Sequence, residues 1–388
     1  MMKLAVIFES SPFDRKGLFN AVHERIRHLA ATDGCEIDAY CVLSRDTAFT
    51  RKVRHTPVTP RKDEVVTDGI TYRMLWYDFS IMDHLTVEYL HRRPLLFGRF
   101  MKKVLPLLQG YDCILAHSFT GGLFALEASA RYGIPYFVTW HGSDVHTHPW
   151  KNPLVLEWTR KVMEGAVCNF FVSRTLMDFS SRICTGVSKE VLYNGVSENF
   201  FRFPDQQREN LRRKYGLEEG TKVVAFVGSL VRVKNPDLLQ PVFSKVREKY
   251  EGPLEFWVVG DGKIRSMVEP ALVSDPSIVV RMWGNRPSDE MPSIMNCIDV
   301  LVLPSRNEGL PLVCAEAIRC GAVAVGADVG GTAEVAGRSN VVPHGEGFVD
   351  AMASKVVSAL NGEVVQSVPD NLDWNRTALK ELEFLRKR

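Results

Sequence analysis

The chain has 388 residues, of which 45% are hydrophobic and 24% charged, and 48 Lys and Arg against 46 Asp and Glu leave a formal net charge of +2. This apolar fraction is too high and this net charge too low for a disordered chain, and near-neutral charge argues against a dedicated nucleic-acid binder. At roughly 150 residues per domain, the length predicts two or three domains, each with its own core.

The eight cysteines form no C-x-x-C pair and no His/Cys cluster at zinc spacing, and most lie in apolar runs. They are interpreted as reduced core residues of a cytoplasmic protein. The apolar run at residues 4–8 is too short for a signal-peptide core, and no stretch approaches the roughly 20 apolar residues of a membrane helix. The sequence therefore predicts a chain that is neither secreted nor membrane-spanning.

Short aliphatic runs alternate with segments of helical period in both halves of the chain. In the first half, strands are predicted over residues 3–8, 36–43, 112–116, 136–139 and 169–172, with helices over residues 18–30 and 123–132. In the second half, strands are predicted over residues 222–227, 254–259, 277–282, 300–303 and 322–326. Such alternation indicates βαβ units and parallel sheets.

The less regular stretch 193–220 separates the two series, so a domain boundary is expected near residue 200. The predicted domains are residues 1–200 and 201–370, followed by a polar C-terminal segment, 371–388. The expected fold class is α/β, with two Rossmann-like domains facing a central cleft. Ligands are expected at the carboxyl ends of the strands, inside that cleft.

The most informative motif is residues 300–335, VLVLPSRNEGLPLVCAEAIRCGAVAVGADVGGTAEV. It predicts a buried strand, a polar loop and a helix whose first residue is Pro311. The free backbone amides of Gly309, Leu310 and the first helical turn then form an anion site, most naturally for phosphate.

Two carboxylates, Glu308 and Glu316, accompany this expected phosphate site. Carboxylates beside a phosphate are unfavourable unless they bind hydroxyl groups, which indicates a sugar and a ribose. The alternative is that the helix dipole favours Glu308 near its N-terminus and that Glu316 occupies a solvated helix position.

The segment resembles the E-x7-E signature of retaining GT-B glycosyltransferases of family 4. The resemblance implies that Glu308 contacts the donor sugar, that Glu316 contacts the nucleotide ribose, and that the loop at Gly330 and Gly331 helps to close the donor pocket.

A second motif is residues 226–239, FVGSLVRVKNPDLL, in which Arg232 and Lys234 could reach a diphosphate. The alternative is an ordinary solvated pair of loop charges. The segment is similar to the family's G-R-x-x-x-x-K-G turn, whose Arg and Lys bind the donor diphosphate. Lys234 falls on the family's lysine, whereas Ser229 stands at the arginine position. Either Arg232 substitutes from further along the turn, or the site uses one cation.

A third motif is residues 138–145, VTWHGSDV, where a predicted strand delivers His141 to its carboxyl end. A lone histidine is more often structural than catalytic, but its place at a strand end before Gly142 favours function. The stretch resembles the family's H-G-S/x-D/E motif, which implies that His141 bonds the donor sugar near the reaction centre. Asp144 is a weaker candidate that could instead cap the next helix.

The resemblance implies three further assignments. In the family, a glycine after the first strand lets backbone approach the donor phosphates, which points to Gly17, although a plain turn glycine is the alternative. The loop containing Asn285 lies near the nucleotide base in the family. The C-terminal polar segment resembles the family helix that crosses back onto the first domain.

Residues 45–104 hold 12 Lys and Arg against 7 Asp and Glu. Within and just beyond them, residues 91–108, HRRPLLFGRFMKKVLPLL, interleave cations with Leu, Phe and Met, which is typical of an interfacial segment on anionic lipid. The alternative is a core-packed helix with a solvated basic face. The membrane interpretation makes a lipid-linked sugar the expected acceptor.

Together these features predict a hexosyltransferase that moves a sugar from a nucleotide diphosphate to a saccharide acceptor. The family resemblance implies retention of anomeric configuration, UDP as the commonest nucleotide, and a role in surface polysaccharide or glycolipid synthesis. No D-x-D pair is present, so neither an obligatory metal nor another cofactor is expected. The expected location is the cytoplasm, peripherally at the membrane. Two alternatives remain open: a nucleotide-sugar epimerase on the same fold, and a non-catalytic scaffolding subunit.

Overall fold

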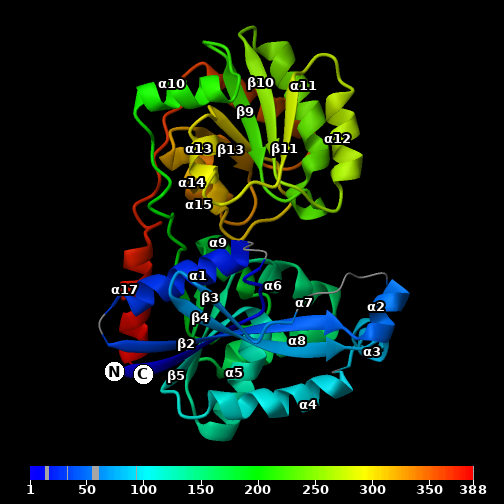
Figure 1. Cartoon of the computed structure of the whole chain (residues 1–388), viewed down its shortest axis with the longest axis vertical. Helices are drawn as coiled ribbons and strands as arrows, with labels where there is room; N and C mark the ends of the chain where they lie inside the picture. Colours follow the sequence, from blue (N-terminus) through cyan, green and yellow to red (C-terminus); the bar gives the residue numbers. More distant parts are fainter. Residues whose placement is uncertain (14–16, 33, 55–60, 93, 388) are drawn as a thin grey trace. The chain divides into compact units, whose positions relative to one another are not determined.

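The computed structural model describes residues 1–13, 17–32, 34–54, 61–92 and 94–387. The chain divides into two compact α/β units (Figure 1). Unit 1 consists of Met1–Asn194 together with Trp374–Arg388, and unit 2 is Gly195–Asp373. Each unit has a largely parallel sheet of the Rossmann type, which confirms the predicted fold class.

The sheet of unit 1 has eight strands in the order β3-β4-β2-β1-β5-β6-β7-β8. The strands are β1 (Met2–Phe8), β2 (Cys35–Asp46), β3 (Glu64–Thr67), β4 (Ile70–Phe79), β5 (Cys113–His117), β6 (Tyr136–Trp140), β7 (Cys168–Phe171) and β8 (Lys189–Val191). All neighbours pair in parallel except β3 and β4. Parallel neighbours bring the loops at their carboxyl ends to one edge of the sheet, where a ligand site is expected.

The β3–β4 hairpin was not predicted, although its turn carries a clear sequence signal. Asp68 and Gly69 have φ angles of 50° and 77°, and an Asp-Gly pair with two positive φ angles is typical of a tight type I′ hairpin turn. The solvent-facing Arg73 and Asp78 interrupt the apolar pattern of β4, so it lacks the continuous apolar run that marks the other long strands.

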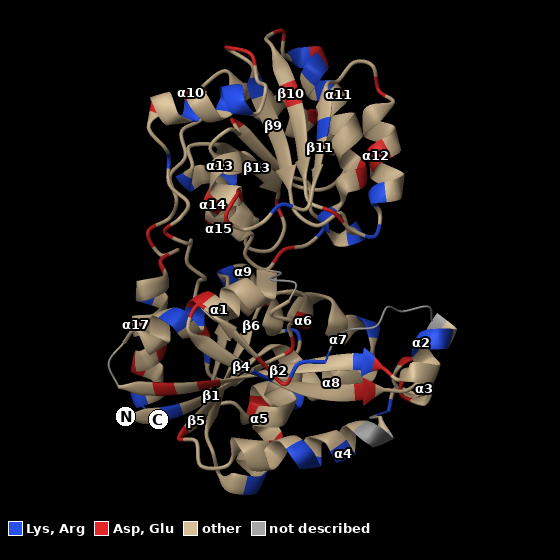
Figure 2. Ribbon diagram, in the orientation of Figure 1, with Lys and Arg blue, Asp and Glu red and all other residues tan. Residues whose placement is uncertain are grey.

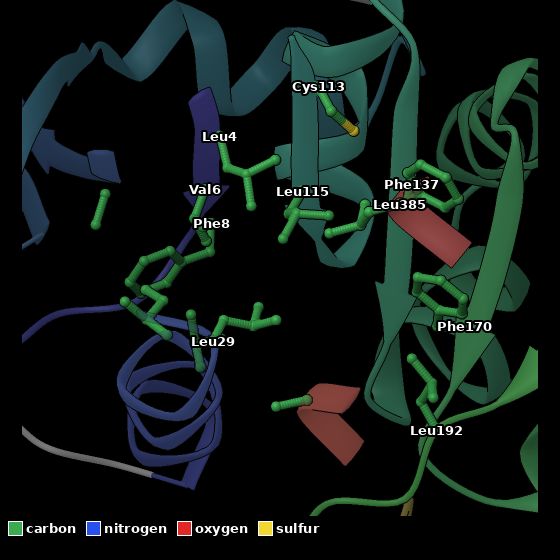
Figure 3. Packing of buried hydrophobic residues seen from close by; sticks show 14 of the residues in the cluster. Leu4, Val6, Phe8, Leu29, Cys113, Leu115, Phe137, Phe170, Leu192 and Leu385 are labelled. Atoms are coloured by element: carbon green, nitrogen blue, oxygen red, sulfur yellow. The ribbon is translucent and has the colours of Figure 1, made fainter. Parts of the chain in front are cut away.

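Helices cover the sheet of unit 1: α1 (Gly17–Ala30), α2 (Ala48–Arg54), α3 (Ile81–Glu88), α4 (Leu95–Val104), α5 (Ser118–Tyr132), α6 (Ser143–His146), α7 (His148–Lys151), α8 (Pro153–Gly165), α9 (Arg174–Ser180) and α17 (Trp374–Arg386). In α1, helical spacing places Phe19, Val22, Ile26 and Leu29 on one buried face. The C-terminal α17 packs against α1, and its Leu385 lies among the core side chains of unit 1 (Figure 3).

Helix α4 has the alternative arrangement that the sequence left open, a core-packed helix with a solvated basic face. Phe97 and Phe100 contact the ring of Phe124, and Met101 and Val104 are buried. Its cationic residues, Arg99, Lys102 and Lys103, are exposed, and Figure 2 colours the Lys and Arg positions of this helix blue. The apolar side of this helix is therefore occupied inside unit 1. No helix of the described residues combines the length and the apolar content needed to cross a bilayer.

The sheet of unit 2 has six parallel strands in the order β11-β10-β9-β12-β13-β14. They are β9 (Lys222–Val227), β10 (Leu254–Val259), β11 (Val280–Gly284), β12 (Val300–Leu303), β13 (Val323–Ala327) and β14 (Val341–Val342). Strands β9, β10 and β12 match their predicted bounds, whereas β11 begins three residues later than predicted. The strand order reverses between β9 and β12, the switch point where doubly wound sheets bind ligands.

The helical elements of unit 2 are α10 (Asp205–Lys214), η2 (Arg232–Lys234), η3 (Pro236–Leu238), α11 (Leu239–Lys249), α12 (Arg265–Val273), α13 (Met291–Met295), α14 (Leu312–Arg319), α15 (Thr332–Ala336), η4 (Arg338–Asn340) and α16 (Phe348–Leu360). The short η2 follows β9 and α14 follows β12, so both begin at the switch point.

Candidate active site

An ion pair joins two of the predicted site residues of unit 2. The Nζ atom of Lys234 donates to both carboxylate oxygens of Glu308, at 2.7 and 2.9 Å. Lys234 comes from the turn after β9 and Glu308 from the loop after β12, which pairs with β9. The side chain of Glu308 is only 8% exposed and that of Lys234 24%, so the pair is largely shielded from water. A shielded cation with an adjacent carboxylate suits a ligand that carries both phosphate and hydroxyl groups.

The N-terminus of α14 lies directly after this loop. Its helical residues begin at Leu312, one residue later than the sequence predicted, and Pro311 occupies the N-cap position. The backbone N–H groups of Gly309 and Leu310 donate to no other group among the described residues. These amides, with those of the first turn, remain available for an anion, and the helix dipole favours negative charge there.

Glu316 lies in the second turn of α14. It does not occupy the solvated helix position that the sequence left open as the alternative. Its side chain is partly buried, and burial raises the pKa of its carboxyl to about 7. Within the described residues its carboxyl group has no hydrogen bond or ion pair. A partly buried, unpartnered carboxyl group beside an anion site is typical of a ligand-binding position.

A glycine loop after β13 contacts the Glu308 loop through its backbone. Gly330 has a φ of +51°, and a Cβ atom built there would lie 1.8 Å from the carbonyl oxygen of Glu308. The N–H of Gly331 donates to the carbonyl of Gly309 at 3.0 Å. Only glycine therefore permits this approach, and the loop fixes the backbone that carries Glu308.

We expect Gly330→Ala to displace the Glu308 loop and to weaken nucleotide binding by about tenfold or more, since a loss of 1.4 kcal/mol is tenfold. Isothermal titration with UDP measures this effect. The matched control is Gly347→Ala, which also has a positive φ, +76°, but whose Cβ would meet nothing within 4 Å. Equal nucleotide affinity in both variants would show that the close contact at Gly330 does not matter.

Three other predicted residues of the donor site are exposed. Arg232 lines a hollow of about 160 Å³ with Arg306 and Met267, and Lys234 and Glu308 are not part of that lining. Asn285 directly follows β11, and Gly17 is the first residue of α1. A Cβ at Gly17 would meet nothing within 4 Å, so nothing inside unit 1 requires glycine there. The donor-binding roles of all three stay predictions.

In unit 1, His141 forms a pair with a second histidine that the sequence did not single out. The Nδ1 atom of His117, at the end of β5, lies 3.0 Å from Nε2 of His141, just after β6. Burial and Arg25 lower the pKa of His141 to about 3. Burial, His141 and Arg25 lower that of His117 well below its usual value. Both rings are therefore neutral at pH 7, and Nδ1 of His141 remains for a ligand.

Arg25 of α1 supports the histidine pair from inside the unit. Its Nη1 donates to Oγ1 of Thr139 in β6 at 2.8 Å, and its Nε lies 3.3 Å from Oε2 of Glu381 in α17. Both charged side chains are 1% exposed. This internal ion pair was missed because neither residue belongs to a motif, and their partnership depends on how α17 packs against α1.

Asp144 and Glu9 complete the polar edge of this sheet. The Asp144 carboxylate accepts hydrogen bonds from the backbone N–H of Gly142 at 2.8 Å and of His141 at 3.1 Å, so it holds the His141 turn. Burial raises its pKa to about 6. Glu9, after β1, accepts from Oγ1 of Thr120 at 2.5 Å. The rule that ligands bind at carboxyl ends of strands could have identified Glu9 and His117.

The lowered histidine pKa values predict acid-sensitive stability of unit 1. When the folded pKa of a base lies below its unfolded value of 6.5, the unfolded chain binds more protons below that pH. Stability is then lost as the pH falls from 6.5, by about 1.4 kcal/mol per pH unit for each histidine. Asp144, whose folded pKa is raised, opposes this trend below pH 6 in all variants.

We therefore expect His141→Gln to lose less unfolding free energy than the unmodified chain between pH 7 and pH 5. Urea unfolding followed by hydrogen exchange of β6 peptides measures the two slopes. Parallel pH profiles in the two proteins would contradict a neutral, half-buried His141.

Two protein families match the chain. Residues 207–375 match the family described as "Glycosyl transferases group 1", and residues 17–195 match the "Glycosyl transferase 4-like domain". Together the two matches take in most of both units. The chain belongs to the GT-B glycosyltransferases of family 4.

Similar proteins and structures agree with this assignment. The putative teichuronic acid biosynthesis glycosyltransferase TuaC of Bacillus subtilis (strain 168) is 28% identical over 58% of this chain and 56% of its own length. The chain thus spans little more than half of that relative. A D-inositol 3-phosphate glycosyltransferase of Nocardiopsis dassonvillei is 25% identical over 98% of this chain and 93% of its own length.

Among solved structures, Anabaena Alr3699/HepE in complex with UDP has a TM-score of 0.70 and 17% identity, with both chains covered completely. Sucrose-phosphate synthase from Thermosynechococcus elongatus has a TM-score of 0.69 and 17% identity, covering 100% of this chain and 94% of that one. At these identities the likeness establishes the GT-B fold alone.

Proposed function

We propose that this protein transfers a hexose, with retention of anomeric configuration, from a UDP-sugar to a lipid-linked saccharide acceptor. The observation that carries the proposal is the shielded Lys234–Glu308 pair beside the free amides of Gly309 and Leu310. The unpartnered, partly buried Glu316 adds the hydroxyl-binding group that a nucleoside requires.

The donor would be held by complementary charges. Lys234 and the amides at the start of α14 would bind the diphosphate and stabilise the charge that develops on it as it leaves. Glu308 would accept hydrogen bonds from sugar hydroxyls, and Glu316 from the ribose. His141, neutral at pH 7, would use Nδ1 to bond the sugar. The proposal needs no metal, since Lys234 and the amides supply the positive potential.

The reaction would break the bond between the anomeric carbon and the diphosphate oxygen. The acceptor hydroxyl would form the new bond on the same face of the sugar, and its proton would pass to the departing phosphate oxygen. We assign no side chain as nucleophile. This front-face route preserves the anomeric configuration without a covalent intermediate.

The choice of UDP and of the pathway draws on similar proteins. Solved structures of similar fold are described as complexes with UDP, with UDP and glucose, and with UDP-glucose. The name of TuaC refers to teichuronic acid biosynthesis, which suits a role in surface polysaccharide or glycolipid synthesis. We propose that the protein acts in the cytoplasm, peripherally at the membrane.

Calorimetric titration with UDP, GDP and ADP tests the donor site first. Selective binding of one nucleotide supports the proposal and identifies the donors to screen, whereas no binding would favour a scaffolding subunit. Isotope-labelled donor with a membrane extract then tests the reaction. Labelled lipid product that needs the extract supports transfer, and conversion of the nucleotide sugar without any acceptor would indicate an epimerase.

A further inference from the structure

Exposed apolar side chains gather on two short helices of unit 1. Helix α3 exposes Met82 (64%) and Leu85 (43%), its C-cap Tyr89 is 70% exposed, and α2 exposes Phe49 (66%) and Val53 (49%). These fractions are high for side chains of this size, and no described part of unit 1 covers them. An apolar surface of this kind, bordered by polar groups, typically marks an interaction site.

The two helices leave the same edge of the sheet. Asp46, at the end of β2, pairs in register with Phe79, at the end of β4, and the N–H of Thr47 donates to the carbonyl of Phe79 at 3.1 Å. Helix α2 begins at Ala48 and α3 at Ile81, immediately after these paired strand ends. The two helices that carry the exposed apolar side chains therefore start beside one another at this edge of the sheet (Figure 1).

A hollow of about 370 Å³ lies beside α3, on the opposite side of that helix from Met82 and Leu85. The residues that line it include Phe79, His84, Glu88, His91, Lys151 and Asn152. This volume lies in the range of small-molecule sites, about 300–1,000 Å³. The amide of Asn152 donates to the carbonyl of Val87 at 3.0 Å, which ties the end of α3 to the opposite wall.

From this juxtaposition we infer that the hollow binds the saccharide head of the acceptor and that the exposed side chains of α2 and α3 take its lipid portion. The inference rests on the proposed function and assigns a place to the acceptor of that reaction. The occupant to which it commits is a glycolipid at a membrane surface.

The lining of the hollow suits a saccharide. It combines an aromatic ring, Phe79, with a carboxylate, Glu88, an ammonium group, Lys151, and imidazoles. Glu88, Lys151 and His91 offer acceptors and donors to sugar hydroxyl groups. His84 already lies 3.0 Å from Asp46 and packs edge-on against Phe79, so it helps to shape the wall of the hollow. The charges of Glu88 and Lys151 balance, so the lining does not favour a purely anionic ligand. Neither Lys151 nor His91 bonds to another described residue.

The surface beside the hollow suits a bilayer with anionic lipid. Arg51 and Lys52 belong to α2, and the exposed Arg92 follows α3; Figure 2 colours the Lys and Arg positions of α2 blue. Apolar anchors together with several cations are the combination that peripheral proteins use at such membranes. A tail in the bilayer and a head in the hollow would place a lipid-linked sugar on unit 1, the unit that carries His141.

Flotation with lipid vesicles tests the apolar surface. We expect the full chain to bind vesicles of phosphatidylcholine with phosphatidylglycerol, and the double variant Met82→Glu/Tyr89→Glu to bind at least about tenfold more weakly. Both side chains are mainly exposed, so the fold should tolerate the change. The control is Leu379→Glu, which places a charge on an apolar side chain of α17 that is 57% exposed. Equal binding by all three proteins would overturn the inference.

Vesicles that also contain a glucosyl, galactosyl or mannosyl diacylglycerol test the hollow. We expect at least one of these glycolipids to increase binding severalfold. The double variant His91→Ala/Lys151→Ala should abolish that increase while it keeps its binding to plain vesicles, and Lys214→Ala on α10 should behave like the unmodified chain. The absence of any increase with all three glycolipids would overturn the assignment of the hollow.

Titration of each variant with UDP separates this inference from the proposed function. Unchanged UDP affinity with impaired vesicle binding supports the acceptor surface. Normal UDP binding with no effect of any α3 or hollow variant overturns the inference alone. A failure to bind any nucleotide refutes the proposed donor site, whatever the vesicles show.

Discussion

Lys234→Ala is expected to weaken UDP binding by about 10- to 100-fold. A hydrogen bond to a charged group contributes about 1.5–3 kcal/mol, and each 1.4 kcal/mol is tenfold in affinity. The variant also leaves Glu308, only 8% exposed, without its cation and next to the proposed diphosphate site. An unpaired carboxylate there repels the ligand, so the effect should lie near the upper limit. Isothermal titration of purified variants measures it.

Two further variants make the result specific. Lys214→Ala removes an exposed lysine of α10 and should leave UDP affinity unchanged. Arg232→Ala decides whether the second cation of the turn reaches the diphosphate: a loss as large as that of Lys234→Ala would mean that donor binding moves Arg232 out of its hollow. If Lys234→Ala binds UDP as well as Lys214→Ala does, the site does not bind diphosphate.

Glu381→Ala is expected to destabilise unit 1 by about 3–5 kcal/mol, the cost of removing one partner of a buried ion pair. The variant leaves the guanidinium of Arg25 without a carboxylate partner. This side chain is 1% exposed and pairs with no other carboxylate among the described residues. Because the chain has two units, whole-protein melting is not a two-state measurement. Hydrogen exchange of β6 peptides, with β9 peptides as the internal reference, isolates unit 1.

Glu383→Ala is the matched control, because it removes an exposed glutamate from the same helix. It should change the stability of unit 1 by about 0.5 kcal/mol at most. The double variant Arg25→Met/Glu381→Leu should recover much of the loss, since apolar residues often replace a buried ion pair without cost. If Glu381→Ala were as mild as Glu383→Ala, the pair would not hold α17 to α1.

Much of the fold could be predicted because buried parallel strands are continuous apolar runs. Residues 222–227, 254–259 and 300–303 were predicted with the bounds that the structure has. Helix α5 was predicted five residues short, since its first turn contains Gly121 and Gly122, which are poor helix formers. Gly121 is required by packing, because a Cβ there would lie 2.3 Å from the carbonyl oxygen of Ile7.

The candidate site, too, could be predicted only in part from the sequence. Lys234 and Glu308 could each be predicted as donor-site residues, because each follows a predicted strand within a motif, whereas their ion pair was not predicted. The His117–His141 pair was not predicted, since the predicted strand ended one residue before His117 and no motif singled that residue out. The exposed surface of α2 and α3 lies in the stretch with no predicted element, where exposure is set by tertiary packing rather than by local pattern.

The two-part composition of unit 1 has a consequence for how the protein is made. The core of unit 1 includes Ala378 and Leu385, yet the whole of unit 2 lies between them and Asn194 in the sequence. At about 5–20 residues per second, translation of that interval takes roughly 10–35 s. During this time unit 1 has its whole sheet but lacks its last helix, and unit 2 is translated completely before α17 follows. The unit that is begun first is therefore finished last.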